Sequence, residues 1–431
     1  MNCGSAFEGL LDAVKQGLVS EAELSQNLRP LLRTRFKLGL LDPPGTCPYD
    51  TISPAQLHSP AHQKLALEAA RKSIVMLKNN RQALPLQKDI KQLFVIGPTA
   101  TSVDVLLGNY YGVSDQLTTV LEAVAGKVHA GTRLEYRQGF LLNELNVNPI
   151  EWAIDEAKGA DAMIVVMGVT TLLEGEEGEA IASPYKGDRE NLRLPESQIT
   201  YLKKLRANND KPIIVVLTGG SPMAIPEVHE LADAVLLAWY PGEAGGQAVA
   251  DVIFGDVSPS GKLPVTFPKS LDQLPPYEDY SMKGRTYRYM KTEPLYPFGF
   301  GLSYSTFTYG PLNLSKNQIT EGENIEVRVK VSNTGSVAAE EVVQLYLSDV
   351  EASTTTPISS LKRFARVALQ PGQSQEITFV LGKNDLLLVN EAGERVLEKG
   401  QFKLSVGGSS ASERAVQLGA PAPQTASFEL I

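Results

Sequence analysis

The 431-residue sequence predicts an α/β fold, in which a mainly parallel sheet is sandwiched by helices and is followed by a smaller antiparallel β-sandwich. Between residues 61 and 254, short apolar runs alternate with amphipathic helical patterns. This alternation is typical of a parallel sheet that helices cover on both faces. Beyond residue 307 the apolar residues recur at every second position and turn residues separate the runs, which is typical of an antiparallel sandwich.

Composition limits the classes of protein to consider. With 43% hydrophobic residues the chain can bury substantial cores, and its length suggests two or three domains. The net charge of -9 comes with no concentrated basic face, so we expect no nucleic-acid partner. No apolar run approaches the roughly 18–20 residues of a membrane-spanning helix, so we expect no membrane partner. His58 and His62 are four apart, but Pro60 argues against a shared helical face, and Cys3 and Cys47 show no metal-ligand spacing.

Two helices are predicted before the alternating region. The first follows an apolar pattern over residues 7–14, and the second covers residues 21–40, with Ser20 as its N-cap and Glu23 at the capping-box position. Because the second helix carries an apolar stripe, we expect it to pack against a part of the protein that this sequence lacks. The Pro- and Ser-rich residues 42–60 then read as a linker.

The alternating region supplies the elements of the sheet domain. Runs rich in valine and isoleucine predict buried strands, and amphipathic stretches predict helices between them. In order, the sequence predicts helix 61–79, strand 92–97, helix 117–125, helix 150–159, strand 162–168, helix 196–208, strand 212–217, helix 223–231, strand 234–239 and helix 246–254.

A dense group of carboxylates follows the strand at 162–168. Glu174, Glu176, Glu177 and Glu179 come within six positions, and the loop continues to the sequence Asp-Arg-Glu at 188–190. In open α/β sheets, ligands bind outside the carboxyl ends of the strands, so this loop is placed where chemistry is expected. Neighbouring negative charges and burial both disfavour ionisation, and a glutamate that stays protonated can act as a general acid. The alternative is that the acidic loop is only solvated surface.

The glycine-rich turns do not predict a nucleotide site or a serine nucleophile. The turn at 97–100 lacks the pattern G-x-G-x-x-G. The turn at 219–222 is not a G-x-S-x-G elbow, and we interpret it as a strand-to-helix turn in which Ser221 caps the helix and Pro222 takes its first position. The segment 240–246 (YPGEAGG) fits either backbone close-packing or the wall of a site.

The last third of the chain divides into two parts. Residues 258–307 hold many prolines and aromatic residues but little periodicity, so we expect an ordered segment whose rings anchor it on other domains. Two-residue alternation then predicts the sandwich, with strands at 325–331, 342–347, 366–369, 376–381 and 402–406.

Several motifs together resemble the carboxyl-terminal half of glycoside hydrolase family 3, of the β-glucosidase or β-xylosidase type. They cover nearly the whole chain: EAARKSIVMLKN (68–79), LPL (84–86), LLGNYYG (106–112), LEGEE with GDR and LP (173–195), YPGEAGGQAVADVIFGDVSPSGKLPVTFP (240–268), RTYRY (285–289) and YPFGFGLSYSTF (296–307). The LEGEE and GDR pattern is similar to the β-xylosidase-like branch. The resemblance implies a retaining β-glycosidase built from a (β/α)8 barrel, an α/β sandwich and a fibronectin type III-like domain.

The resemblance also implies roles for the acidic loop. The family's acid/base is a glutamate in this loop; Glu176 is the first candidate, Glu177 the second and Glu174 the third. Asp188 and Arg189 match the family's Asp-Arg pair, with substrate contact and a purely structural role both open. The family's nucleophile is a barrel aspartate, which has no counterpart here, so we expect little or no hydrolysis by this chain alone. The substrate would be an oligosaccharide or aryl β-glycoside, with no cofactor and no metal.

The implied domains are helices from the end of a missing N-terminal barrel domain plus a linker (1–59), the α/β sandwich (60–257), the aromatic- and proline-rich linker (258–307) and the fibronectin type III-like domain (308–431). In this view Met1 is an internal methionine of a longer protein. A hypothesis of a different class is a noncatalytic carbohydrate-binding or scaffold module.

Overall fold

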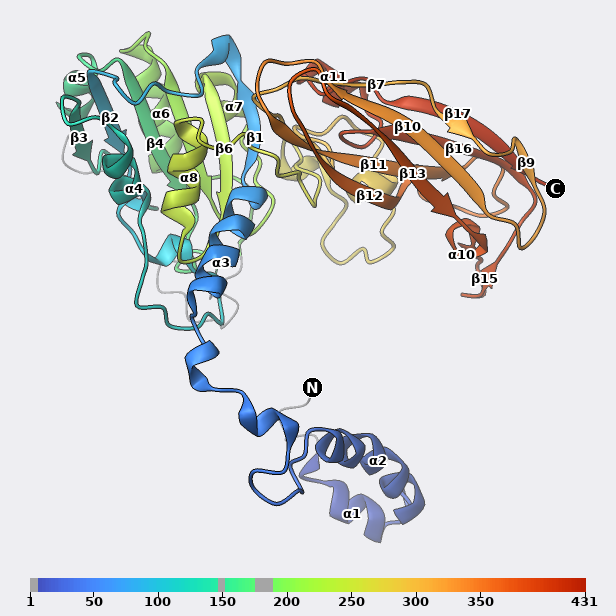
Figure 1. Ribbon diagram of the computed structural model, residues 1–431. Helices are drawn as coiled ribbons and strands as arrows, with labels where there is room; N and C mark the ends of the chain where they lie inside the picture. The colour runs from blue at the N-terminus through green and yellow to red at the C-terminus, as the bar shows by residue number, and fades with distance from the viewer. Residues whose placement is uncertain (1–6, 146–151, 175–188) are drawn as a thin grey trace. The chain divides into compact units, whose positions relative to one another are not determined.

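A six-stranded mixed sheet is the centre of the first large domain (Figure 1). The computed structural model describes residues 7–145, 152–174 and 189–431, and the chain groups into two units, Met1–Gln63 and Lys64–Ile431. The strand order is β1-β6-β5-β4-β2-β3, in which all neighbours are parallel except β1 and β6. The strands are β1 (Val75–Asn79), β2 (Gln92–Ile96), β3 (Arg133–Arg137), β4 (Ala162–Gly168), β5 (Ile213–Thr218) and β6 (Ala234–Trp239).

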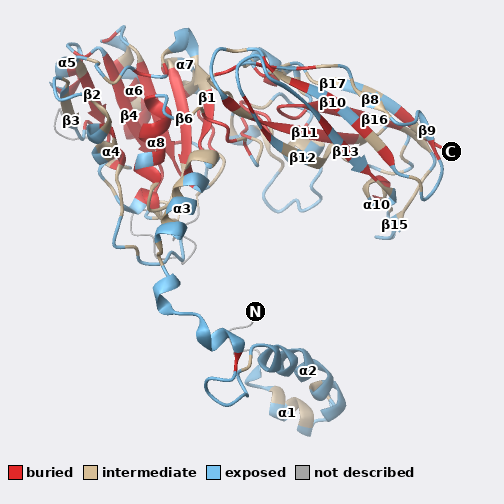
Figure 2. Ribbon diagram, viewed as in Figure 1, coloured by how far each residue is buried: buried red, intermediate tan, exposed pale blue. Residues whose placement is uncertain are grey.

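Helices cover both faces of this sheet, as the sequence predicts. Successive side chains of a strand point to opposite faces, so Met163 and Val165 pack in one core and Ile164 and Val166 in the other. The first core is completed by α5 (Trp152–Ala157), α6 (Glu196–Ala207) and α7 (Pro226–Leu231). The second is completed by α3 (Pro60–Ser73), α4 (Val120–Lys127) and α8 (Gly245–Ile253). Figure 2 shows β4 and β6, which lie between the two layers, as almost entirely buried.

The predicted helix 61–79 is wrong in its second half. The helix ends at Ser73, and β1 follows as an edge strand that pairs antiparallel with β6. Val75, Met76 and Leu77 are all buried, and a short continuous apolar run of this kind fits a helix and a strand equally well by periodicity. The sequence also did not predict β3, whose side chains are only partly buried and carry a weak apolar signal.

Two glycines of the segment 240–246 lie where the backbone is closely packed, and Gly246 allows the start of α8 to approach the residues that precede α4. The Gly246 amide donates a hydrogen bond to the Thr118 carbonyl at 3.0 Å. A Cβ at Gly246 would lie 2.2 Å from the Thr119 carbonyl oxygen, and one at Gly245 would lie 2.3 Å from the Pro241 ring. The backbone close-packing predicted for these residues is therefore confirmed.

The linker after the sheet domain is ordered by its aromatic rings. Its helices are the short η7 (Leu271–Gln273) and α9 (Thr286–Tyr289). Phe267, Tyr296 and Phe300 are fully buried and join the first core of the sheet domain. Tyr287 stacks on the Phe298 ring with the centroids 4.1 Å apart. The anchoring role predicted for these rings is confirmed.

Two sheets form the final β-sandwich, and their strands pair antiparallel except for β9, which lies parallel to β17. One has the order β13-β10-β7 with β8 beside β10, and the other the order β12-β11-β16-β17-β9. The main strands are β10 (Ile325–Asn333), β11 (Ala339–Asp349), β12 (Ser360–Leu369), β13 (Ser374–Leu381), β16 (Gly400–Gly407) and β17 (Gln424–Leu430). The shorter strands are β7 (Phe307–Tyr309), β8 (Asn313–Leu314) and β9 (Gln318–Ile319). A separate hairpin consists of β14 (Leu388–Val389) and β15 (Arg395–Val396). Helix α10 (Lys383–Leu386) precedes this hairpin, and α11 (Glu413–Gln417) precedes β17. Strand β17 was not predicted, because its apolar alternation is weak.

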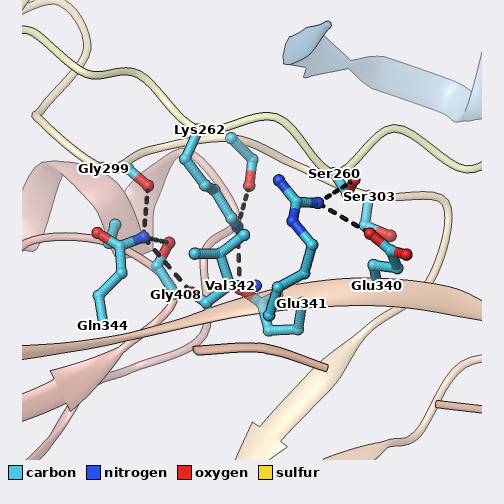
Figure 3. Close-up of polar contacts among 12 residues, drawn as sticks. Ser260, Lys262, Gly299, Ser303, Glu340, Glu341, Val342, Gln344 and Gly408 are labelled. Carbon is cyan, nitrogen blue, oxygen red and sulfur yellow. Dashed lines mark hydrogen bonds and ion pairs between the residues drawn. The ribbon is translucent and has the colours of Figure 1, made fainter. Parts of the chain in front are cut away.

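Strand β11 is joined to the linker by polar contacts (Figure 3). Lys262 forms an ion pair with Glu341 at 3.0 Å, and the two side chains are 12% and 3% exposed. The Gln344 amide donates to the carbonyls of Gly299 at 3.0 Å and Gly408 at 2.9 Å. These contacts satisfy polar groups that the sandwich buries against the linker.

The unit Met1–Gln63 contains the two predicted N-terminal helices, α1 (Leu10–Lys15) and α2 (Glu21–Lys37). The capping box between Ser20 and Glu23 is present as predicted. Neither helix holds a buried residue, and Figure 2 shows α2 as exposed along its length. Two short 3-10 helices follow, η2 (Pro48–Thr51) and η3 (Pro54–Gln56). Across the described ranges, the structure contains no helix with both the length and the apolar character needed to cross a membrane.

Candidate functional site

The carboxyl ends of β4, β5 and β6 bring one group of polar side chains together. Glu174 lies six residues beyond the end of β4, Ser221 lies in the turn after β5, and Tyr240 directly follows β6. Because parallel strands β4, β5 and β6 are neighbours, these three exits meet at one edge of the sheet. This is the edge at which the sequence predicts the acidic loop.

The Glu174 carboxylate is the centre of this group. Its Oε1 accepts hydrogen bonds from the Gly220 amide at 2.7 Å and from the Tyr240 hydroxyl at 2.7 Å. Its Oε2 accepts one from the Ser221 hydroxyl at 2.5 Å. The Arg189 guanidinium lies 3.6 Å from the same oxygen, and the Glu174 side chain is only 12% exposed. A carboxylate with these partners is a satisfied acceptor, which makes its burial tolerable.

Arg189 connects the other end of the acidic loop to the same group. Its guanidinium donates to the Ser221 hydroxyl at 3.0 Å and to the Arg193 carbonyl at 2.7 Å. Burial lowers the pKa of Arg189, and the adjacent Glu174 carboxylate opposes that shift. An arginine keeps its charge through such a change, so a cation faces Glu174 at neutral pH.

Tyr240 is held as a hydrogen-bond donor. Burial, and after it the charge of Glu174, raise the pKa of the Tyr240 phenol, which keeps the hydroxyl protonated. The preceding residue Trp239 has φ +62°, a left-handed conformation that is uncommon outside glycine. This conformation turns the chain out of β6 at Tyr240.

The space opposite Glu174 at Gly220 is tight, mainly because of the Tyr240 ring. A Cβ at Gly220 would lie 3.1 Å from the Tyr240 ring and 3.6 Å from Glu174 Oε1. On the other side, the Glu174 amide donates to the Thr170 carbonyl at 3.0 Å, which closes a turn after β4. The Asn109 side chain donates to the Glu174 carbonyl at 3.4 Å, which connects the loop after β2 to the same place.

The structure locates two of the five predicted site residues and brings them together. Glu174 and Arg189 are described, and they approach each other as stated above. Glu176, Glu177 and Asp188 lie outside the described residues. Their assignments stay predictions.

The sequence did not predict that Gly220, Ser221 and Tyr240 are partners of Glu174. The interpretation of Ser221 as a helix cap with Pro222 at the first helical position is wrong, because α7 begins at Pro226 and Ser221 instead donates to Glu174. One signal was available: each of these residues follows a predicted buried strand at the same sheet edge.

The group contains one buried carboxylate, one buried guanidinium and two hydroxyls. Among residues 7–145, 152–174 and 189–431, no cluster of three or more histidine, cysteine, aspartate or glutamate side chains could hold a metal ion. The contacts hold Glu174 and Arg189 against the turn after β5, and Glu174 also against Tyr240.

Comparison with known proteins identifies relatives of both domains. Residues 74–304 match the model of the glycosyl hydrolase family 3 C-terminal domain, and residues 341–410 match that of the fibronectin type III-like domain. A periplasmic β-glucosidase of Salmonella typhimurium is 34% identical over 92% of this chain and 55% of its own length. A β-xylosidase of Formosa agariphila is 36% identical over 90% of this chain and 54% of its own length.

Solved structures show the same similarity. A β-glucosidase from Erythrobacter marinus superimposes with a TM-score of 0.83 at 32% identity, over 98% of this chain and 57% of the other. A β-glucosidase from Listeria innocua in complex with isofagomine gives a TM-score of 0.81 at 29% identity, over 98% of this chain and 57% of the other. This chain thus spans about half the length of the relatives that it matches.

Proposed function

Because this chain belongs to glycoside hydrolase family 3, we propose that it is the carboxyl-terminal portion of a retaining β-glycosidase that removes terminal β-linked glucose or xylose. In this proposal it supplies the general acid/base glutamate, Glu176 or after it Glu177, from the loop between Glu174 and Arg189. The nucleophilic aspartate belongs to a barrel domain that is absent from this sequence. The observation that carries the proposal is the placement of both ends of the acidic loop at the carboxyl edge of β4, β5 and β6.

The chemistry requires two carboxyl groups about 5 Å apart. The barrel aspartate attacks the anomeric carbon while the glycosidic C–O bond breaks, and the loop glutamic acid gives its proton to the departing oxygen. The same glutamate then takes a proton from water, whose oxygen attacks the anomeric carbon and releases the aspartate. A chain with the glutamate alone can carry out neither step.

The names of the relatives support the substrate class. The matched enzymes are named as β-glucosidases and β-xylosidases, so a β-glucoside or β-xyloside is the substrate to test first. Asp188 and Arg189 are proposed to contribute to substrate binding. For Arg189, the contacts to Glu174 and Ser221 also support a structural role.

The proposal predicts that activity depends on a barrel. Nitrophenyl β-glucoside and β-xyloside are to be assayed with this chain alone, with a barrel domain of a family relative alone, and with the two fused in the order barrel then chain. We expect hydrolysis by the fusion protein and background rates from either part. Robust turnover by this chain alone would refute the division of the two carboxylates.

A further inference from the structure

The hydrogen bonds of Glu174 bear on its role in the acidic loop. We propose that Glu174 is a positioning residue, which fixes the start of the loop on the exits of β5 and β6, and that Glu176 or Glu177 supplies the proton. This inference rests on the proposed function, because a position for the loop has a catalytic consequence only if the loop carries the acid. It assigns a role to Gly220, Ser221 and Tyr240 as well.

The hydrogen bonds of the Glu174 carboxylate run in the wrong direction for a proton donor. A general acid must present an O–H to the substrate oxygen. Both oxygens of Glu174 instead accept, and one of the donors is the Gly220 amide, which cannot reverse its role. The Gly220 amide hydrogen points at Oε1 at 2.7 Å, so an O–H on this oxygen would face a second donor, and the Arg189 guanidinium lies 3.6 Å from Oε2.

Several elements of the fold meet at Glu174, as expected for a residue that holds a loop in place. Its partners come from the exit of β5 and the exit of β6, and Arg189 comes from the far end of the loop. Ser221 donates to Glu174 and accepts from Arg189, so one hydroxyl joins the two ends of the loop. Glu174 and Arg189 therefore close the loop at its base and fix that base to the sheet.

Glu174 and Arg189 have little access to solvent. The side chains of Glu174 and Arg189 are 12% and 15% exposed, so both are largely removed from the solvent side. Removal of one partner from a largely buried charge pair is strongly destabilising, because the other charge stays buried. Such a pair holds a fixed geometry, and a misplacement of about 1 Å can reduce catalysis about 100-fold.

The test begins with the full chain as it is. Replacement of Glu174 by alanine removes the acceptor of the Gly220 amide, and we expect that amide to exchange with solvent at least about 10-fold faster by hydrogen-exchange NMR. Glu190→Gln is the matched control, since Glu190 is an exposed glutamate beside Arg189, and it should leave Gly220 exchange unchanged. Unchanged exchange of Gly220 in Glu174→Ala would overturn the inference.

The catalytic readout uses the fusion protein with a barrel. Glu174→Gln should lower kcat about 10- to 100-fold and keep the alkaline-side inflection of the pH–rate profile, because the proton donor is still present. Tyr240→Phe and Ser221→Ala each remove one donor and should lower kcat by smaller factors. Loss of the alkaline inflection in Glu174→Gln would identify Glu174 as the acid and overturn the inference, as would unchanged kcat.

Failure of the inference can be told apart from failure of the proposed function. If the double variant Glu176→Gln and Glu177→Gln keeps full turnover, the proposed function fails and the positioning role fails with it. If that double variant loses turnover but Glu174→Gln does not, only the positioning role fails.

Discussion

At the scale of single residues, the contacts that matter most join positions far apart in the sequence. Ser221 and Tyr240 reach Glu174 across 47 and 66 positions. Local sequence patterns show that both residues follow strands. A serine before a proline also fits a helix cap, so the contact of Ser221 with Glu174 could not be predicted. Glu174 and Arg189 were predicted as site residues from motifs, and their mutual contact became visible only in three dimensions.

His229 is a residue whose titration should affect stability. Its Nδ1 lies 2.7 Å from the hydroxyl of Tyr296, and burial, with the positive charges of Lys78 and Arg414, lowers the pKa of His229 to about 4. The unfolded chain has the ordinary value of about 6.5, so between these values the unfolded state binds more protons. The contribution is present above pH 6.5 and is lost as the pH falls towards 4.

We therefore predict that His229→Asn flattens the pH dependence of stability. Urea unfolding between pH 7 and pH 4 should show that the wild type loses roughly 1–2 kcal/mol more than the variant, a value reduced because the ring is partly exposed. The carboxylates are the same in both proteins, so they change the free energy of unfolding with pH by the same amount in each. Parallel curves for the two proteins would contradict the assigned pKa.

At the scale of elements, the sheet and the sandwich were predicted well where periodicity was strong. The strands β4, β5 and β6 were placed within a residue or two because fully buried parallel strands read as continuous apolar runs. Strand β1 was taken as helix because its apolar run is short and follows a helix directly. The start of α7 was misplaced because Pro222 and Pro226 are both able to open a helix.

The ion pair between the linker and β11 makes a prediction at this scale (Figure 3). Lys262→Met would leave the Glu341 carboxylate buried with the Val342 amide as its hydrogen-bond donor. Loss of one partner from a buried pair costs about 3–5 kcal/mol, so urea unfolding should show a drop of that size. Adding Glu341→Leu should recover much of the loss, since it removes the unpaired charge.

The matched control is the surface pair between Lys316 and Glu323, whose side chains are 48% and 38% exposed. Lys316→Met should leave the free energy of unfolding unchanged, because exposed ion pairs contribute little. If Lys262→Met were as well tolerated as Lys316→Met, the linker would not depend on this pair for its attachment to the sandwich.

At the scale of the whole molecule, the fold and the family could both be stated from the sequence. The α/β domain and the fibronectin type III-like domain are confirmed by the family matches and by the solved relatives. The division into residues 1–59, 60–257, 258–307 and 308–431 stays a proposal.

The sequence alone does not say which glutamate of the loop is the general acid. Repeated glutamates make the alignment of the loop ambiguous, and the hydrogen bonds of Glu174 supply the argument that separates it from Glu176 and Glu177. The central claim is therefore that the loop between Glu174 and Arg189 delivers a proton to a bond that a separate barrel attacks.

The most direct measurement of this claim compares leaving groups in the fusion protein. Dinitrophenyl glycosides need little protonic help, whereas nitrophenyl and unactivated glycosides need much. For Glu176→Gln, or for Glu177→Gln if that residue is the acid, we predict a near-normal kcat/KM on the dinitrophenyl glycoside, because kcat/KM reports the step in which the aspartate displaces the leaving group, and a kcat/KM lower by about 100-fold or more on the poorer leaving groups. An equal loss of kcat/KM on both substrates, or no loss on either, would contradict the account.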